Sequence, residues 1–137
     1  MEKVFVDSDI VLDLLSGRQP HYDFAAELFS LADNSTIKLY VSSLTFANVN
    51  YIISKQHSAG QARKMLSKFK TLVNVLAVND KVIELALASD FRDFEDAIQY
   101  NTAIEYGIIT LLTRNLKDFK KADIVILTAQ QYLKTID

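Results

Sequence analysis

Five short runs of apolar residues are spaced along the chain, and each run gives way to polar residues. The runs are rich in β-branched and aromatic side chains, which is typical of strands buried inside a sheet. The predicted strands cover residues 3–6, 37–41, 72–78, 108–113 and 124–127.

The stretches between these runs carry apolar side chains every three or four residues, which is helical spacing. Strands that alternate with helices are typical of a largely parallel sheet with helices on both faces. In such a sheet, ligands bind at the carboxyl ends of the strands. The predicted helices cover residues 10–15, 22–32, about 43–53, 60–70, 82–88, about 93–106 and a short segment from 129 onward.

Composition limits the chemistry available to this chain. Its 137 residues suffice for one compact domain, so residues 1–137 are expected to form a single domain. The absence of cysteine excludes disulfides, thiol nucleophiles and cysteine-based zinc sites, and only two histidines occur. No apolar run approaches the roughly 20 residues that span a bilayer, and no secretory signal pattern is present. The expected location is the cytoplasm.

The net charge is only −2, but the charges are unevenly distributed. Residues 34–79 contain no Asp or Glu, so the rest of the chain is acidic. The positive charges of this stretch belong to Lys38, Lys55, Arg63, Lys64, Lys68 and Lys70.

Polar side chains, many of them carboxylates, follow the predicted strands or precede the fourth one. Because the carboxyl ends of parallel strands meet at one edge of a sheet, we expect these side chains to gather there, with Glu95 facing solvent. They are Asp7 and Asp9 after the first strand, Asp93, Glu95 and Asp96 in the helix before the fourth strand, and Thr113, Arg114, Asn115 and Asp118 after it.

These residues also have structural interpretations. Asp7 can cap the helix that follows it, although Asp9 can serve instead. Asp93 and Asp96 have the spacing of a helix cap and its partner three residues on, which suits a capping role for Asp93. Asn115 can cap the turn after the fourth strand.

An acidic cluster without histidine or cysteine suits Mg²⁺ or Mn²⁺ rather than Zn²⁺. Carboxylates held close together repel one another, and a divalent cation relieves this repulsion. Such an ion activates water and stabilises charge on a phosphate oxygen, which is the chemistry of a nuclease.

Four segments, in this order, resemble the motifs of the PIN-domain family and, within it, the VapC-like toxins of bacterial toxin–antitoxin pairs. They are residues 4–9 (VFVDSD), 42–48 (SSLTFAN), 93–99 (DFEDAIQ, followed by Ala103) and 113–119 (TRNLKDF). Each motif alone is a weak signal, but four in this order and spacing are fairly specific, and together they cover nearly the whole chain.

The resemblance implies a three-layer α/β/α sandwich around a central, mostly parallel sheet, and a metal-dependent endoribonuclease that hydrolyses RNA. By position, it makes Asp7, Asp96 and Asp118 the catalytic residues and the ligands of Mg²⁺ or Mn²⁺. It also implies a cognate antitoxin protein as partner, and a homodimer. The residues expected to support the site are Asp9, Asn48, Asp93, Thr113 and Asn115.

The second motif departs from the family pattern, which usually places a glutamate where Asn48 stands. The asparagine still offers an amide oxygen, but it has no negative charge and cannot act as a base. No acid of residues 34–79 can substitute, although Asp93 or Asp9 can compensate. The alternative function is therefore a catalytically weakened PIN fold that binds RNA or a protein partner.

The basic stretch can guide a phosphate backbone toward the acids. A solvated helix face, or a surface for an acidic antitoxin tail, explains the same charges equally well. The RNA-binding candidates are Lys55, Arg63, Lys64, Lys68 and Arg114.

A phosphotransfer enzyme or a receiver domain is a further alternative, because residues 7–9 form an Asp-x-Asp motif. A receiver needs an aspartate after its third strand, and residues 78–80 fit that pattern poorly. Asp-x-Asp phosphatases usually need a larger chain with a cap. The sequence therefore favours the nuclease interpretation.

Overall fold

The computed structural model describes residues 1–119 and 122–136. No helix within these ranges is long and apolar enough to cross a membrane. The element order is β1 (Glu2–Val6), α1 (Ser8–Ser16), α2 (His21–Asp33), β2 (Ile37–Ser42), α3 (Ser43–Gln56), α4 (Ala59–Lys70), β3 (Asn74–Leu76), α5 (Asp80–Ala88), α6 (Phe94–Glu105), β4 (Thr110–Leu112), the 3₁₀-helix η1 (Leu116–Phe119), β5 (Val125–Leu127) and α7 (Ala129–Leu133).

The strands of the described residues form one sheet in the order β3-β2-β1-β4-β5, and every pairing is parallel. The central strand is β1, in which Phe5 pairs with Tyr40 of β2 on one side and Leu111 of β4 on the other. The chain leaves β1 toward β2 and later returns on the opposite side of β1 to form β4. This reversal places the topological switch point at the carboxyl end of β1.

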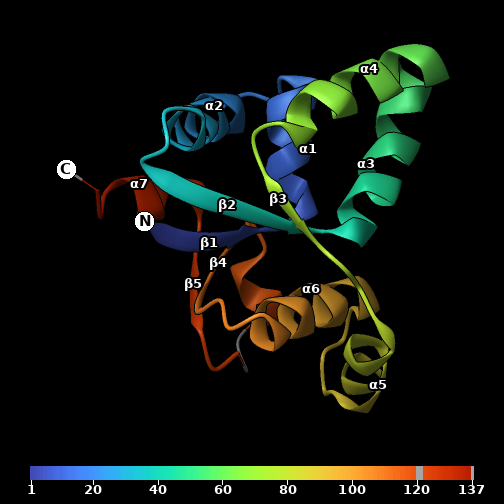
Figure 1. Cartoon of the computed structure of the whole chain (residues 1–137), viewed down its shortest axis with the longest axis vertical. Helices are drawn as coiled ribbons and strands as arrows, with labels where there is room; N and C mark the ends of the chain where they lie inside the picture. Colours follow the sequence, from blue (N-terminus) through green and yellow to red (C-terminus); the bar gives the residue numbers. More distant parts are fainter. Residues whose placement is uncertain (120–121, 137) are drawn as a thin grey trace.

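Helices cover both faces of the sheet, which gives the three layers of an α/β/α sandwich (Figure 1). In this view α1–α4 lie on one side of the sheet, and α5 and α6 lie on the other. The side chains of β1 alternate between the two cores. Val4 and Val6 belong to the core of the α1–α4 side, whereas Phe5 packs with Ala103 of α6 and Leu111. Burial on both faces is the reason that the strands are continuous apolar runs.

Most element boundaries differ from the sequence-based expectation by one to three residues, and β3 and α4 are two examples. The strand predicted over residues 72–78 is reduced to Asn74–Leu76, because β3 is an edge strand and pairs only with β2. Helix α4 begins at Ala59, before the expected start at residue 60. Ser58 caps it by accepting a hydrogen bond from the Gln61 backbone N–H at 3.2 Å.

Candidate metal centre

Segments that are far apart in the sequence meet at the carboxyl end of β1. Asp7 directly follows β1, and its backbone N–H donates to the Leu112 carbonyl of β4 at 2.9 Å. Helices α3 and α6 reach the same place, where Gln99 Nε2 donates to Thr45 Oγ1 at 2.9 Å and to Ser8 Oγ at 3.1 Å. The switch point is therefore bordered by α1, α3, α6 and the loop after β4.

Asp7 caps helix α1 and also lies in the candidate metal site. It is the N-cap of α1, because its Oδ1 accepts a hydrogen bond from the Ser8 backbone N–H at 2.8 Å. Its Oδ2 accepts from Thr113 Oγ1 at 2.9 Å, and the side chain is buried with a residue exposure of 7%. Since each carboxylate oxygen accepts more than one bond, capping leaves Asp7 able to bind a cation.

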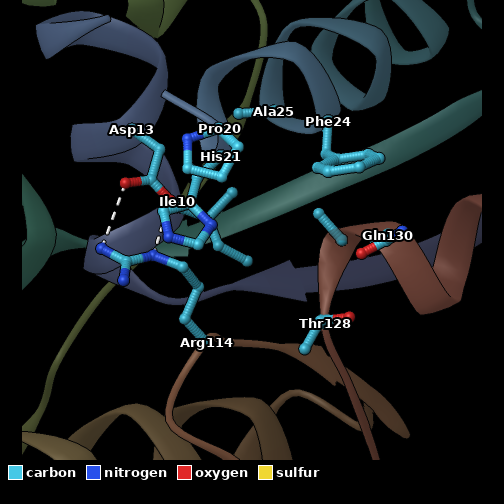
Figure 2. A pocket seen from close by; sticks show the side chains of 10 residues that line it. Ile10, Asp13, Pro20, His21, Phe24, Ala25, Arg114, Thr128 and Gln130 are labelled. Atoms are coloured by element: carbon cyan, nitrogen blue, oxygen red, sulfur yellow. Dashed lines mark hydrogen bonds and ion pairs between the residues drawn. The ribbon is translucent and has the colours of Figure 1, made fainter. Parts of the chain in front are cut away.

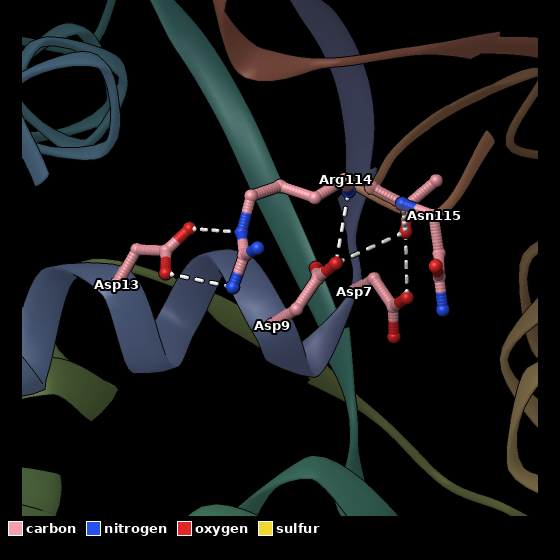
Figure 3. A network of polar contacts seen from close by, with 6 residues as sticks. Asp7, Asp9, Asp13, Arg114 and Asn115 are labelled. Carbon is pink, nitrogen blue, oxygen red and sulfur yellow. Dashed lines mark hydrogen bonds and ion pairs between the residues drawn. The ribbon is translucent and has the colours of Figure 1, made fainter. Parts of the chain in front are cut away.

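Asp9 is tied to the loop that follows β4 (Figure 3). Its Oδ2 accepts from the Arg114 backbone N–H at 2.9 Å and lies 3.3 Å from Thr113 Oγ1. The same threonine oxygen accepts from the Asn115 backbone N–H at 3.0 Å. The other oxygen of Asp9, Oδ1, is buried and has no hydrogen-bond partner among the described residues. These bonds fix the loop against the start of α1.

The Arg114 guanidinium points away from the oxygens of Asp7 and Asp9 and forms an ion pair with Asp13 of α1. Its Nε lies 2.7 Å from Asp13 Oδ2 and its Nη2 lies 3.1 Å from Asp13 Oδ1, and Asp13 is only 1% exposed. The ion pair forms part of the wall of a pocket of about 280 Å³ between α1, α2 and the start of α7 (Figure 2). The RNA-binding role of Arg114 stays a prediction, and the structure gives its side chain a clear partner within the protein.

Asp96 lies in the first turn of α6 and is 7% exposed. Its backbone N–H donates to Asp93 Oδ1 at 3.0 Å, so Asp93 is the helix cap that the spacing predicts. Asp96 Oδ2 is buried and has no hydrogen-bond partner within residues 1–119 and 122–136. A buried carboxylate oxygen without a partner is unfavourable unless a proton, water or cation satisfies it. This oxygen makes the site suitable for a positive ion.

Burial and mutual repulsion raise the pKa values of these carboxyl groups. Burial, followed by the nearby Asp9 and Asp96 charges, raises the pKa of Asp7 to about 8. Burial also raises the pKa of Asp9. For Asp96, burial and then repulsion from Asp93 and Asp118 raise the pKa to about 7. Asp7 and Asp96 therefore lie within electrostatic reach of each other, and a divalent cation would favour their ionised forms.

Asp118 lies in η1 and is half-buried, and it is close enough to Asp96 for its charge to raise the pKa of that residue. It also lines a pocket of about 540 Å³. Phe91, Tyr100 and Arg92 contribute to the same pocket, and the two aromatic rings have centroids 5.1 Å apart. Asp118 therefore lies between this pocket and the acidic edge, by which we mean the carboxylates at the carboxyl end of β1.

The donor set fits a hydrated cation rather than a closed protein cage. Among the described residues, no three His, Cys, Asp or Glu side chains lie close enough together to enclose an ion. Proteins usually hold Mg²⁺ through one or two carboxylates while it keeps several waters. The orphaned oxygens of Asp9 and Asp96, beside the buried Asp7, satisfy that requirement.

Asn48 lies on α3, and its contact differs from the sequence-based expectation. Its Nδ2 donates to Glu95 Oε2 of α6 at 3.3 Å. Glu95 is exposed, as predicted, but it is turned toward α3 and does not stand alone in solvent. The acid beside Asn48 thus comes from outside the acid-free stretch 34–79, and it is Glu95 rather than Asp93 or Asp9.

A buried polar group formed by Ser8, Thr45 and Gln99 joins α1, α3 and α6. Its members lie within the motif segments, but no role is predicted for them from the sequence. Gln99, 1% exposed, donates to Ser8 and Thr45, and Ser8 Oγ in turn lies 3.1 Å from Thr45 Oγ1. The available signal is the position of Gln99, three residues after Asp96 and therefore on the same side of α6. The group sets the distance between the three helices.

The basic candidates Lys55, Arg63, Lys64 and Lys68 are exposed on α3 and α4. Lys55 lies in the last turn of α3, about 10 Å along the helix axis from Asn48. Its Nζ lies 2.7 Å from the Tyr51 hydroxyl and 4.1 Å from the centroid of that ring. Their contribution to RNA binding stays a prediction.

The fold has counterparts among known proteins. The model of the PIN domain family matches residues 3–117 of the chain. The chain therefore belongs to the PIN domain family. No curated protein matches its sequence.

Several solved structures of toxin–antitoxin proteins share the fold. A toxin–antitoxin complex from Klebsiella pneumoniae is 25% identical, with a TM-score of 0.69 over 92% of this chain and 97% of that chain. VapBC2 from Rickettsia felis, bound to a DNA fragment from its promoter, is 21% identical, with a TM-score of 0.67 over 91% of this chain and 96% of that chain. VapC20 from Mycobacterium tuberculosis, a sarcin–ricin loop cleaving toxin, is 18% identical, with a TM-score of 0.69 over 89% and 96%.

Proposed function

We propose that residues 1–137 form one PIN-like domain that acts in the cytoplasm as a metal-dependent endoribonuclease, the toxin of a toxin–antitoxin pair. The observation that carries the proposal is the gathering of Asp7, Asp9 and Asp96 at the carboxyl end of β1, where Asp9 Oδ1 and Asp96 Oδ2 are buried and lack partners among the described residues. Membership of the PIN domain family supports a nuclease, and the RNA-cleaving VapC20 is one of the similar structures.

In this proposal Asp7, Asp96 and Asp118 are the catalytic residues and would hold a hydrated Mg²⁺ or Mn²⁺, in part through its bound waters. An ion bound there lowers the pKa of a coordinated water and stabilises charge on phosphate oxygens. The residues that support the three ligands are Asp9, Asn48, Asp93, Thr113 and Asn115.

The supporting residues act mainly by orientation. Thr113 Oγ1 holds Asp7 Oδ2 at 2.9 Å, and the Asp93 cap fixes the first turn of α6, from which Asp96 projects. Burial keeps bulk water away from Asp7, which strengthens its attraction to a cation. These residues would thus hold a divalent cation at the point where a scissile phosphate must approach.

The RNA would lie across this edge of the sheet. The pocket beside Asp118 offers the rings of Phe91 and Tyr100, on which an unpaired base can stack, and Arg92 for a phosphate. Exposed lysines and arginines of α3 and α4 would attract the backbone over a longer range. Unpaired RNA is the substrate form that suits these features.

The similar VapBC and toxin–antitoxin complexes support an antitoxin as the protein partner. We infer a homodimer as the assembly on the resemblance alone. Size-exclusion chromatography with light scattering, with and without the product of an adjacent small reading frame, would test both inferences.

RNA cleavage with Mg²⁺ or Mn²⁺ tests the proposed activity. Wild-type protein should cut single-stranded RNA, and Asp7→Asn and Asp96→Asn should not. Glu84→Gln, an exposed change on α5, is the control for loss of one negative charge. Cleavage that survives both aspartate changes would remove these acids from the mechanism.

The second candidate function is a catalytically weakened PIN fold that binds RNA or a protein. Two observations favour it: Asn48 stands at the position of the usual glutamate, and no three acids among the described residues enclose an ion. Titration with Mn²⁺ separates the candidates. Binding that Asp7→Asn abolishes would support the nuclease, whereas RNA binding without metal binding would support the weakened fold.

A further inference from the structure

Helix α3 borders the acidic edge but brings no acid of its own. Carboxylates reach this edge from the start of α1, from α6 and from η1, whereas residues 34–79 contain no Asp or Glu. Even so, α3 is in direct contact with the site through Thr45, which binds Ser8 and Gln99. Any negative charge on the α3 side of the acidic edge must therefore come from another element.

The contacts between α3 and α6 form two matched pairs. Thr45 and Asn48 are three residues apart on α3, and Glu95 and Gln99 are four apart on α6, so each pair of positions shares a helix face. Thr45 Oγ1 accepts from Gln99 Nε2 at 2.9 Å, and one turn away Asn48 Nδ2 donates to Glu95 Oε2 at 3.3 Å. The buried first contact fixes the relative rotation of the helices and so directs Glu95 toward Asn48.

The second contact lies where hydrated ions can reach it. Thr45 and Gln99 are each 1% exposed, whereas Glu95 is exposed and Asn48 is half-buried. Glu95 also precedes Asp96, whose buried Oδ2 has no partner in the described part of the chain, and its charge adds to the repulsion at Asp96. The Glu95 carboxylate is thus held on the α3 side, within electrostatic reach of the proposed ligand Asp96.

Asn48 and Glu95 are chemically matched. The amide of Asn48 donates to the Glu95 carboxylate, whereas a carboxylate at position 48 would repel it. The helix dipole favours an acid in the first turn of α6 whichever way it points, so the dipole does not explain the contact with α3. In the metal-free protein, a negative charge can therefore come to this place from α3 or from α6, but not easily from both.

We propose that Glu95 is a further carboxylate ligand of the divalent-cation site, acting directly or through a bound water, and that Asn48 is the positioning residue that holds it on the α3 side. This inference rests on the proposed function, because it adds a ligand to the same site. It assigns the charge that α3 lacks to a residue of the neighbouring helix.

Calorimetric titration of the full-length protein with Mn²⁺ tests this assignment without relying on activity. Glu95→Gln should weaken Mn²⁺ binding by about tenfold or more. The swapped variant Asn48→Glu/Glu95→Gln, which moves the carboxylate to α3, should recover most of the lost affinity. Asn48→Glu alone should give no gain, and the exposed control Glu84→Gln should bind Mn²⁺ as the wild type does.

Thermal unfolding in EDTA accompanies each titration and separates binding from folding. Because the Asn48–Glu95 contact is exposed, Glu95→Gln should leave the melting temperature of the metal-free protein unchanged. Wild-type Mn²⁺ affinity in Glu95→Gln would overturn the inference. So would a swapped variant that binds no better than Glu95→Gln, or a clear gain from Asn48→Glu alone.

Asp96→Asn distinguishes the failure of this inference from the failure of the proposed function. If Asp96→Asn loses Mn²⁺ binding while Glu95→Gln keeps it, only the role of Glu95 is wrong. If the wild type and Asp96→Asn both fail to bind Mn²⁺, the metal-dependent function and the role of Glu95 are wrong together.

Discussion

The two sides of the acidic edge are built differently. On the α1–β4 side, the Thr113 hydroxyl and the Arg114 backbone N–H hold Asp7 and Asp9 with hydrogen bonds of 2.9 Å. On the α3–α6 side, Asp96 keeps a buried oxygen that has no partner among the described residues. The first side is held in place mainly by the protein itself, although Asp9 Oδ1 there also lacks a partner among the described residues, whereas Asp96 on the second side has no side-chain partner of this kind. Stability should therefore depend on the first side, and metal binding should depend on both.

The largest effect should be on RNA cleavage, which needs both sides. Asp7→Asn and Asp96→Asn each remove a charge without changing shape, and each should lower the cleavage rate by about 1,000-fold, as loss of one preorganised electrostatic group does. Single-turnover cleavage of a fluorescent RNA with Mn²⁺ measures this. If only one of the two variants lost cleavage activity, the chemistry would depend on one side of the acidic edge and not on both.

The next effect concerns stability and belongs to the α1–β4 side. Arg114→Met leaves the buried Asp13 carboxylate without its partner, which should lower the free energy of unfolding by about 3 kcal/mol. Urea unfolding followed by circular dichroism measures the change. The double variant Asp13→Asn/Arg114→Met removes both charges and should recover a large part of the loss. An unchanged free energy of unfolding in Arg114→Met would show that the ion pair does not support this side.

A smaller effect follows from the raised pKa values of Asp7 and Asp96, about 8 and about 7. Between the ordinary aspartate pKa and these values, the folded protein binds more protons than the unfolded chain, so stability falls as pH rises. The metal-free protein should therefore be more stable at pH 5 than at pH 8. Asp7→Asn keeps the cap but not the charge, and it should raise stability at pH 8 by about 1–2 kcal/mol.

Melting temperatures in EDTA at the two pH values measure this effect. Mn²⁺ should stabilise the wild type more at pH 8 than at pH 5, because it binds the ionised carboxylates. Equal stability of the metal-free wild type at both pH values would contradict the raised pKa of Asp7, and with it the electrostatic account of the site.

Much of the fold follows from local sequence pattern. Strands buried on both faces must be continuous apolar runs, so β1 and β2 are found with nearly correct ends, and the all-parallel sheet confirms the alternation of strands and helices. The cap at Asp93 follows equally directly, because cap and helix are neighbours in the chain. The position of Asp7 at the sheet edge could also be predicted, because Asp7 directly follows β1 and the strands of a parallel sheet end at the same edge.

The contacts between distant elements could not be predicted in the same way. Spacing within α6 shows which residues share a face, but the contact of Glu95 with Asn48 depends on how that helix is rotated against α3. The Asp13–Arg114 pair likewise joins residues 101 positions apart. Such contacts arise from packing of the whole core. The motifs that contain Asn48, Glu95 and Arg114 do not indicate which distant residue each of them contacts.

The smallest effect belongs to the α3–α6 side and sharpens the comparison. Asn48→Ala removes an exposed hydrogen bond of 3.3 Å to Glu95, so the metal-free protein should lose less than about 0.5 kcal/mol of stability. Urea unfolding in EDTA measures this loss next to the much larger one of Arg114→Met. A loss as large as that of Arg114→Met would mean that both sides support the fold equally. A small loss, combined with weaker Mn²⁺ binding, would assign stability to the α1–β4 side and ligand capacity to the α3–α6 side.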